Sequence, residues 1–541
     1  MRLKKDSSEQ KLRGAYYTPL QLANAMVSLV ASPNITNVLE PSCGDGVFLD
    51  SLVSLNFLEN ISNVTAVEIE DDEAQKVSHN YQDNRNVHVL NEDFFDFYQR
   101  VYGKQTYDLI LGNPPYIRYQ YLTEEQRDIQ SSILTSHGMK SNKLINAWVA
   151  FLVACVQLLS ENGRIAFVIP AEILQVAYAE DLRLFLSNQL SKITLLTFEQ
   201  LIFPDIEQEI LVFIGEKGKE EKGIRIIELS SLDDINKIDL QSNGFQKLMH
   251  VKEKWTKYFV TAEEMQIIQS IRHDNRFIRF SDLALINVGI TTGNNAYFSV
   301  DRNTENRFDL SSVTLPLIGR SSHARGIYFT KNDWHQNIES GKRAMLISFP
   351  DIPYEDYPIQ HREYIEIGVK NEENKGYKCS IRDRWYIVPS VWIPDAFFLR
   401  RSNLYPKFVL NCCDAVSTDT MHRIKFNEGV NAENILLSYY NSISFAFTEI
   451  CGRSYGGGVL EILPGEVGNI MLPIIESIDD ELRNTLLSNI DTIIRNDEDI
   501  EMVLDLVDQK LLVEILGIDK NICLSCRKIW KKMQKRRLGR G

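Results

Sequence analysis

Between about residue 35 and residue 215, short β-type runs alternate regularly with helical stretches, and this alternation limits the possible folds more than any other pattern in the chain. It predicts an α/β domain with a largely parallel sheet, because each helix returns the chain to the same edge of the sheet. The apolar spacing of residues 146–159 predicts a packing helix between two strands. The expected strands are TNVLEP, NVTAVEIE, NVHVLNEDF, YDLILGNPP, GRIAFVIP, KITLLTFEQ and EILVFIGEKG.

The regular alternation stops beyond this region, which indicates a second domain of another class. A chain of 541 residues is also too long for one compact core. The charged and polar segment 216–250 is typical of a boundary region. We expect an α/β domain over residues 1–245, a mixed α+β domain over residues 246–476, and a helical acidic segment with a basic C-terminal tail over residues 477–541. The tail, RKIWKKMQKRRLGRG, is expected to be a disordered, solubilising end rather than a DNA contact.

The composition is that of an ordinary globular protein, with 44% hydrophobic and 24% charged residues. No apolar run approaches the roughly 20 residues that a membrane span needs, and the N-terminus does not read as a signal peptide. Eight scattered cysteines favour a reduced, cytoplasmic protein. Cys523 and Cys526 form a CxxC pair with no second pair at zinc spacing, so no metal is expected.

The net charge of −14 argues at first against a nucleic-acid partner, but the charge is unevenly distributed. Acidic residues are concentrated in residues 461–526, whereas residues 251–460 are close to neutral. Local patches matter more for binding than the total charge. The net charge therefore does not exclude nucleic acid as a partner.

The run VLEPSCGDG passes from a strand through a glycine-rich turn into a helix. Gly44 and Gly46 would let the backbone approach a ligand closely. Glu40 lies at this turn, Glu68 ends the next strand, and Asp93 follows the third. Because open α/β sheets bind ligands at the carboxyl ends of their strands, these acids predict a nucleoside site, with Glu68 on the ribose and Asp93 on the base. Each acid alone is equally typical of a helix cap, and the absence of GxGxxG disfavours a dinucleotide.

The fourth strand ends in Asn113-Pro114-Pro115-Tyr116. The two prolines fix the backbone, so that the Asn113 side chain and the Pro114 carbonyl present two acceptors to a planar NH2 group. Accepting both amine hydrogens makes an adenine N6 more nucleophilic, and more strongly so as positive charge develops. Tyr116 offers an aromatic face for the base. In isolation the same four residues are also compatible with a structural turn.

Together these motifs resemble the γ-group (TaqI-like) of N6-adenine DNA methyltransferases. The resemblance rests on Gly14-Ala15-Tyr16-Tyr17-Thr18-Pro19, EPSCGDG, VEIE, NEDF, NPPY and Phe203-Pro204. In that group a target-recognition domain follows the catalytic domain. Three segments of the C-terminal half look like such a domain, namely residues 286–300, 416–424 and 452–467. Within the first, TTGNN would present backbone amides to phosphates, although it is equally typical of a plain turn.

The resemblance implies a class I AdoMet-dependent, Rossmann-like fold and assigns roles to individual residues. Thr18 would bind the methionine end of AdoMet, and Phe94 would pack on its adenine. The cofactor site would comprise Thr18, Glu40, Gly44, Gly46, Glu68, Asp93, Phe94 and Pro115. The target-base site would comprise Asn113, Pro114, Tyr116 and Phe203.

The activity implied is site-specific transfer of a methyl group from AdoMet to N6 of a flipped adenine in double-stranded DNA. Such a protein would protect DNA from a separate cognate restriction endonuclease. The oligomeric state stays open, with a monomer as the favoured state. About 13 residues precede the first motif, so no nuclease domain is expected upstream. Two alternatives remain open: methylation of another planar amine (cytosine N4, an RNA base or a protein glutamine), and a non-catalytic, sequence-specific DNA-binding protein.

Overall fold

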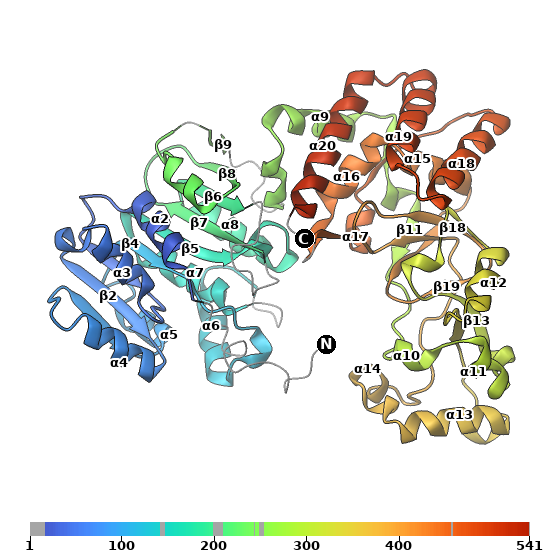
Figure 1. The fold of residues 1–541 in the computed structure, drawn as a ribbon, viewed down its shortest axis with the longest axis horizontal. Helices are drawn as coiled ribbons and strands as arrows, with labels where there is room; N and C mark the ends of the chain where they lie inside the picture. Colours follow the sequence, from blue (N-terminus) through green and yellow to red (C-terminus); the bar gives the residue numbers. More distant parts are fainter. Residues whose placement is uncertain are drawn as a thin grey trace. The chain divides into compact units, whose positions relative to one another are not determined.

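The computed structural model divides the chain into two compact units, Met1–Val260 and Thr261–Gly539, which are considered separately (Figure 1). No helix in the part of the chain that it describes is long and apolar enough to cross a membrane. The described residues are 17–140, 146–198, 209–242, 244–247, 254–455 and 458–539.

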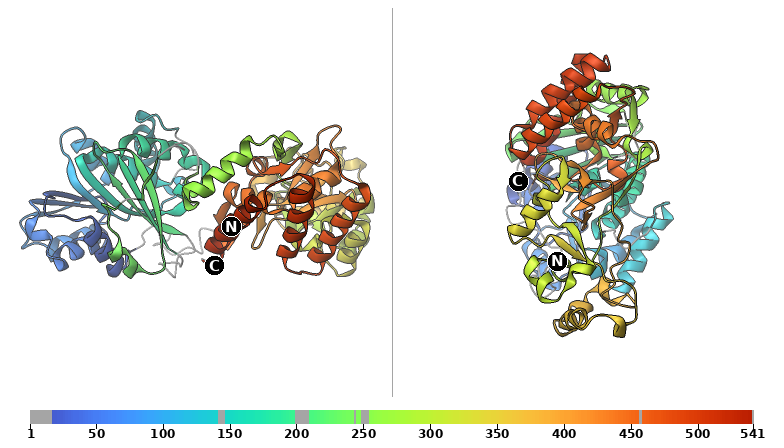
Figure 2. Two further views of the ribbon diagram at one scale, coloured as in Figure 1. Left: turned by 90° about the horizontal axis from the view of Figure 1, so that it is seen from above. Right: turned by 90° about the vertical axis from the view of Figure 1, so that its right-hand side faces the viewer.

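The first unit is built on a nine-stranded sheet in the order β3-β2-β1-β4-β5-β7-β6-β8-β9, whose twist is visible in Figure 2. The strands β1 to β5 pair in parallel, and β7 lies antiparallel between β5 and β6. This confirms the largely parallel sheet predicted from the alternation. The strands are β1 Asn37–Glu40, β2 Asn63–Glu68, β3 Val87–Asn91, β4 Tyr107–Gly112, β5 Leu159–Pro170, β6 Lys192–Phe198, β7 Ile210–Glu216, β8 Gly223–Leu229 and β9 Gln246–Lys247.

Helices connect these strands and cover the sheet, with α2 packed on α3 and α5 packed on α7. Helix α7 is apolar on almost every side and almost wholly buried, as the spacing of its residues predicts. The helices of this unit are α2 Leu20–Val30, α3 Val47–Ser54, α4 Asp71–Asn80, α5 Phe94–Val101, α6 Glu124–Ser136, α7 Ala147–Leu158 and α8 Glu180–Gln189.

The charged segment 216–250 is part of the sheet rather than a connection beside it, since it contains β8 and β9. The high charge of the segment hides these strands from a prediction based on composition. Arg225, in the middle of β8, is only 5% exposed. Its guanidinium donates to the Thr194 hydroxyl, to the Ser242 carbonyl and hydroxyl, and to the Asp239 carbonyl. A buried arginine of this kind is stable because its donors are satisfied, and a reading of composition alone cannot detect it.

The second unit is a mixed α+β structure with several small sheets. The largest has five strands in the order β11-β20-β16-β18-β14. Beside it lie a four-stranded sheet, β12-β15-β13-β19, and a three-stranded sheet, β17-β22-β21. The strands of these three sheets are β11 Ala284–Asn287, β12 Ser299–Val300, β13 Thr314–Ile318, β14 Tyr328–Thr330, β15 Met345–Ile347, β16 Ala396–Leu399, β17 Arg401–Ser402, β18 Phe408–Cys412, β19 Val416–Ser417, β20 Met421–Phe426, β21 Arg453–Tyr455 and β22 Val459–Glu461.

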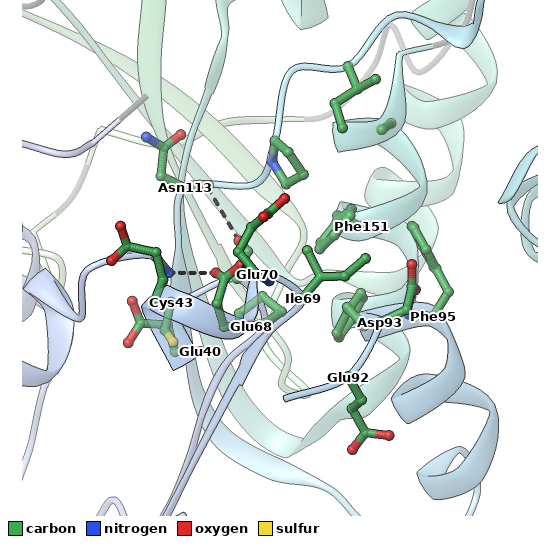
Figure 3. A pocket seen from close by; sticks show the side chains of 18 of the residues that line it. Glu40, Cys43, Glu68, Ile69, Glu70, Glu92, Asp93, Phe95, Asn113 and Phe151 are labelled. Atoms are coloured by element: carbon green, nitrogen blue, oxygen red, sulfur yellow. Dashed lines mark hydrogen bonds between the residues drawn. The ribbon is translucent and has the colours of Figure 1, made fainter. Parts of the chain in front are cut away.

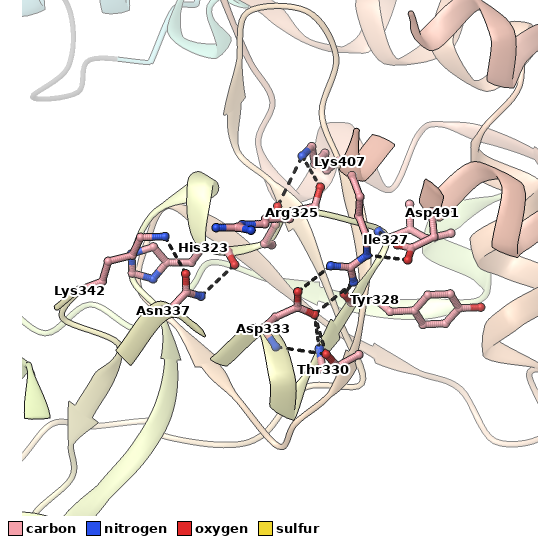
Figure 4. Close-up of polar contacts among 12 residues, drawn as sticks. His323, Arg325, Ile327, Tyr328, Thr330, Asp333, Asn337, Lys342, Lys407 and Asp491 are labelled. Carbon is pink, nitrogen blue, oxygen red and sulfur yellow. Dashed lines mark hydrogen bonds and ion pairs between the residues drawn. The ribbon is translucent and has the colours of Figure 1, made fainter. Parts of the chain in front are cut away.

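Helices α12 (Lys331–Glu339) and α18 (Asp480–Arg495) are joined by a network of ion pairs (Figure 4). The Arg495 guanidinium donates to Asp333 at 2.6 Å, to Asp491 at 2.6 Å and to the Tyr328 carbonyl at 2.9 Å. Asp491 in turn accepts from the Ile327 backbone amide at 2.8 Å. The network thus ties the C-terminal helices to the edge strand β14.

The C-terminal segment is helical, as expected, but the prediction of a disordered basic tail is wrong. Residues 520–538 form α20 (Lys520–Leu538), which packs on α16 (Ser442–Cys451). Arg537 is 2% exposed and pairs with Glu449 at 2.8 Å. It also donates to the carbonyls of Asn403, Leu404 and Gly458. The basic residues look like a solvated tail in the sequence because their acidic partners lie far away along the chain.

We expect Arg537→Met to destabilise the second unit by about 3–5 kcal/mol, because the substitution leaves Glu449 buried without its cation. The midpoint of thermal unfolding of the full chain would measure the effect. Lys535→Met, at an exposed position of the same helix, is the matched control and should change stability by less than about 0.5 kcal/mol. Equal effects of the two substitutions would contradict the proposed role of the ion pair.

Candidate active site

A cavity of about 680 Å³ lies at the carboxyl ends of β1, β2, β3 and β4 (Figure 3). Its walls come from the chain before α2, the turn after β1, the end of β2, the start of α5, the turn after β4, and parts of α6 and α7. Parallel pairing places all these strand ends at one edge of the sheet. The cavity brings together eight of the residues expected in a site: Thr18, Glu40, Gly44, Glu68, Asp93, Phe94, Asn113 and Pro115.

The glycine turn after β1 adopts the conformation that the sequence requires. Gly44 has φ of +52° and Gly46 has φ of +86°, in the left-handed region that favours glycine. Gly46 precedes α3 as its N-cap residue. A Cβ atom there would come within 3.2 Å of the Val77 side chain, so the close packing against α4 also requires glycine.

Glu68 and Asp93 each hold the backbone and line the cavity at the same time. The Glu68 carboxylate accepts from the backbone amides of Gly44 at 2.8 Å and Glu70 at 2.9 Å. Asp93 caps α5 by accepting from the Phe95 amide at 2.7 Å. A carboxylate offers about four acceptor positions, so these bonds leave acceptor capacity for a ligand. Capping and ligand binding are therefore compatible at these positions.

Glu40 is the last residue of β1 and is 2% exposed. Among the described residues, its Oε2 atom has no hydrogen-bond partner. Burial raises the pKa of this carboxyl well above its usual value, and the negative charges of Asp45, Glu68 and Asp50 raise it further.

The lining of the cavity is strongly acidic. Among the described residues that form it there is no lysine, arginine or histidine. This charge pattern favours a ligand with net positive charge and disfavours a nucleotide phosphate. The acids of the lining are Glu40, Asp45, Glu68, Glu70, Asp72, Glu73, Glu92 and Asp93.

The lining also contains apolar and aromatic side chains. The rings of Phe94 and Phe151 stack with centroids 4.7 Å apart and an interplanar angle of 19°. Ile69, Pro115 and Leu122 also line the cavity. Such a combination of aromatic and aliphatic side chains suits the planar ring of a nucleoside base.

Asn113, directly after β4, is oriented by a residue from the N-terminal end of the unit. Its Nδ2 atom donates to the Thr18 hydroxyl at 3.2 Å, and Thr18 is 6% exposed. The Ser42 hydroxyl lies 3.4 Å from the Asn113 backbone carbonyl, to which it donates. With the amide nitrogen engaged at Thr18, the side chain presents its oxygen as an acceptor.

The other predicted target-base residues are placed differently. Tyr116 is 8% exposed, and its hydroxyl donates to the Val168 carbonyl at 3.1 Å. Neither Pro114 nor Tyr116 is among the described residues that line the cavity. Phe203 lies outside the described residues.

Sequence reasoning missed several residues of the lining. Tyr17 lies close to Gly44, and its hydroxyl donates to Glu73 at 3.1 Å. Phe151 lies on the helix α7, which we had interpreted as a packing element only. Gln126 and Gln130 come from α6. Only Tyr17 had a signal in the sequence, since it belongs to the same motif as Thr18.

Comparisons with known proteins place this geometry in a family. Residues 23–203 match the family model of the Eco57I restriction-modification methylase. Residues 252–512 match that of the C-terminal domain of the type II methyltransferase M.Eco57I.

Individual proteins show the same relationship. The chain is 26% identical to the type II methyltransferase M.AccI of Acinetobacter calcoaceticus, over 87% of each protein. It is 29% identical to a tRNA1(Val) (adenine(37)-N6)-methyltransferase of Haemophilus influenzae, over 25% of this chain and 54% of that protein. The solved structure of the type IIL restriction-modification enzyme MmeI in complex with DNA shares its fold, with a TM-score of 0.56 and 14% identity, over 98% of this chain and 76% of that one.

The fold and the site together define a class I AdoMet-dependent DNA methyltransferase. The two family models together span most of the chain, which with its curated relatives is a type II restriction–modification methyltransferase.

The cavity fits the AdoMet cofactor of this family in chemistry as well as in position. AdoMet carries a sulfonium and an ammonium group against one carboxylate, and the acidic lining suits this net positive charge. Glu68 and Asp93 are placed to accept hydrogen bonds from hydroxyl and amino groups. Phe94 and Phe151, whose rings stack on each other, would offer a wall for the adenine ring.

The contact between Thr18 and Asn113 can be tested by substitution. We expect Thr18→Val to lower the rate of methyl transfer by roughly 10-fold, because the Asn113 amide loses a hydrogen bond worth about 1.4 kcal/mol. Thr18→Ser should retain most of the rate. AdoMet affinity, measured by calorimetry, should change by less than about 3-fold in both variants. A large loss of AdoMet affinity in Thr18→Val would instead support a direct contact with the methionine end of the cofactor.

Proposed function

We propose that this protein methylates N6 of an adenine that is flipped out of double-stranded DNA, within a site set by the second unit. The observation that carries the proposal is the position of Asn113 between the acidic cavity and the fixed Pro114-Pro115 backbone at the end of β4. Bound AdoMet supplies an electrophilic methyl group. The protein has to present a weakly nucleophilic amine to it.

Asn113 and the Pro114 carbonyl perform this task in the proposed mechanism. The Asn113 side-chain oxygen and the Pro114 oxygen each accept one hydrogen of the target amine. Both bonds strengthen as the nitrogen becomes cationic in the transition state, so they stabilise that state more than the substrate. Thr18 positions the Asn113 amide through the contact to its nitrogen. Tyr116 and Phe203 would stack on the base, as the resemblance to the γ-group implies.

Adenine N6 is preferred to other planar amines for two reasons. The one relative described above whose name states the reaction acts on adenine N6. That relative acts on tRNA, but its match covers only 25% of this chain, whereas the matches to type II methyltransferases extend into the second unit. A second unit of this size suits DNA, since a duplex must be held while a base is extruded. We further propose that methylation protects DNA from a separate cognate restriction endonuclease.

We propose that the second unit is the target-recognition domain, and one feature supports this role. The three segments that resemble such a domain meet at one place. A Cβ atom on Gly289 would lie 1.8 Å from the Thr418 carbonyl, which shows how closely the first two segments pack. Asn295 donates to Asp419 at 3.5 Å. Arg400, beside β17, links Asp419 at 3.8 Å to Glu461 of the third segment at 3.1 Å.

This meeting place has the chemistry of a base-reading surface. The Asp419 side chain is 49% exposed, and Arg401, which is also 49% exposed, pairs with Glu461. Carboxylate, amide and guanidinium groups are those that read base edges in the major groove.

Asn113→Ala provides the central test of the proposed chemistry. Turnover should fall by at least about 10²-fold, a loss of roughly 2.7 kcal/mol in transition-state stabilisation. AdoMet and specific DNA affinity should change by no more than a few-fold. Asn113→Asp retains an acceptor and should keep more activity than the alanine variant. Single-turnover methyl transfer, followed by base analysis of the product, measures both the rate and the methylated atom. Near-normal turnover of Asn113→Ala, or methyl groups on cytosine N4, would contradict the proposal.

Asp419→Asn tests the recognition surface. The substitution keeps the size of the side chain but adds a donor, so discrimination at one base pair should fall by about 1–3 kcal/mol. Modification-sensitive sequencing of DNA from cells that express the variant would show a relaxed preference at one position of the site. Asp356→Asn, at an exposed position of the same unit, is the control. An unchanged recognition sequence for Asp419→Asn would exclude this residue from base reading.

A further inference from the structure

We propose that AdoMet binding expels a proton from Glu40, and that this carboxylate thereby selects the cationic cofactor over the uncharged-sulfur product of the reaction. The inference depends on AdoMet being the cofactor and is independent of which base is methylated. It assigns to Glu40 a role in discriminating the two states of the cofactor, beyond lining the site.

The position of Glu40 supports the first half of the proposal. The side chain is 2% exposed and lines the cavity, and its Oε2 atom has no hydrogen-bond partner among the described residues. Glu68, by contrast, has both carboxylate oxygens engaged by backbone amides. A buried carboxylate without donors is costly to ionise, so the proton is retained when the cavity holds no cation.

The groups around Glu40 add to this cost. Cys43 and Asp45 belong to the adjoining turn, Asp50 lies on α3, and Glu68 lies on the neighbouring strand β2. Carboxyl groups on three elements thus disfavour a negative charge on Glu40. The phenol hydroxyls nearby are those of Tyr17, which donates to Glu73, and Tyr81, which donates to Asp50.

The nearby cation does little to offset these charges. Lys76 on α4 is 59% exposed and pairs with Glu73 at 3.7 Å. Of the carboxyl groups near Glu40, it lowers the pKa of Asp45. Solvent screens an exposed pair of this kind strongly. As far as the described residues are concerned, the positive charge that would stabilise an ionised Glu40 therefore has to come from the ligand.

AdoMet supplies a positive charge at its sulfonium group, whereas the sulfur of its product, S-adenosylhomocysteine, is uncharged. S-adenosylhomocysteine has the same ammonium and carboxylate groups but a neutral thioether. When AdoMet binds, the Glu40 carboxyl loses its proton to the solvent as a carboxylate forms beside a cation. After methyl transfer the sulfonium charge is lost, and with it part of the attraction between the Glu40 carboxylate and the bound cofactor. The proton returns, and the product is held less tightly than the substrate.

The sign of the pH dependence follows from this exchange. The ligand-free protein binds one proton more than its AdoMet complex at pH values between the usual carboxyl pKa and the raised pKa of Glu40. AdoMet affinity therefore rises with pH in this interval, by up to 10-fold per pH unit, and levels off above the raised pKa.

The test is calorimetry of AdoMet binding to the full-length protein at one pH in buffers of different ionisation enthalpy. The dependence of the observed heat on the buffer gives the number of protons released. We expect a release approaching one proton for AdoMet and a clearly smaller release for S-adenosylhomocysteine. No release for AdoMet would overturn the proposal directly, without any variant.

Glu40→Gln identifies the group that releases the proton. Glutamine has the same shape but cannot ionise, so the release should disappear and the ratio of AdoMet to S-adenosylhomocysteine affinities should fall by at least about 5-fold. Asp71→Asn, which removes an exposed carboxylate outside the cavity lining, should leave the proton count unchanged. An undiminished release in Glu40→Gln would assign the proton to another residue. Failure to methylate adenine in DNA would refute the proposed function but not this inference.

Discussion

Parallel pairing of β1 with β2 and with β4 is the constraint on which the active site depends. It brings Glu40, Glu68 and Asn113 to one edge of the sheet, although 73 residues of chain separate the first from the last. The hydrogen bond from the Gly44 amide to Glu68 then ties the turn after β1 to the end of β2. A turn held in this way is rigid before any ligand arrives, and rigid placement is what a site for positioning two reactants requires.

The sequence allowed the core of the first unit to be predicted because its strands end in residues with unusual requirements. These local signals can be recognised from the sequence alone: two glycines, both of which have positive φ, a pair of prolines, and acids at strand ends. Strand β8 gave no such signal, since Arg225 and its neighbours look like a solvated linker. The same reason explains the tail. The partner of Arg537 is Glu449, 88 residues away, and no local pattern reveals that pairing.

Side-chain roles at the site were harder to predict than its location. Thr18 is expected at the cofactor and lines the cavity, but its contact with Asn113, 95 residues further along the chain, had no signal in the sequence. Phe151 was assigned to packing, yet it stacks with Phe94 at the wall of the cavity. Both positions depend on how helices and strands cross in space, which the periodicity of one segment does not contain. The motifs therefore predicted where the site lies, whereas the hydrogen bonds within it could be identified only from the structure.

The acidity of the chain, which at first opposes a DNA substrate, becomes consistent with one when the acids are located. Eight acidic side chains line the cofactor cavity. They attract a cationic cofactor and repel phosphates, so the backbone of a DNA duplex is kept out of the cavity that AdoMet must enter. In the proposed reaction, a base extruded from the duplex would carry no charge and would not be repelled in this way. The same field would then separate the two substrates by charge, and only the neutral part of the polyanion would approach the methyl donor.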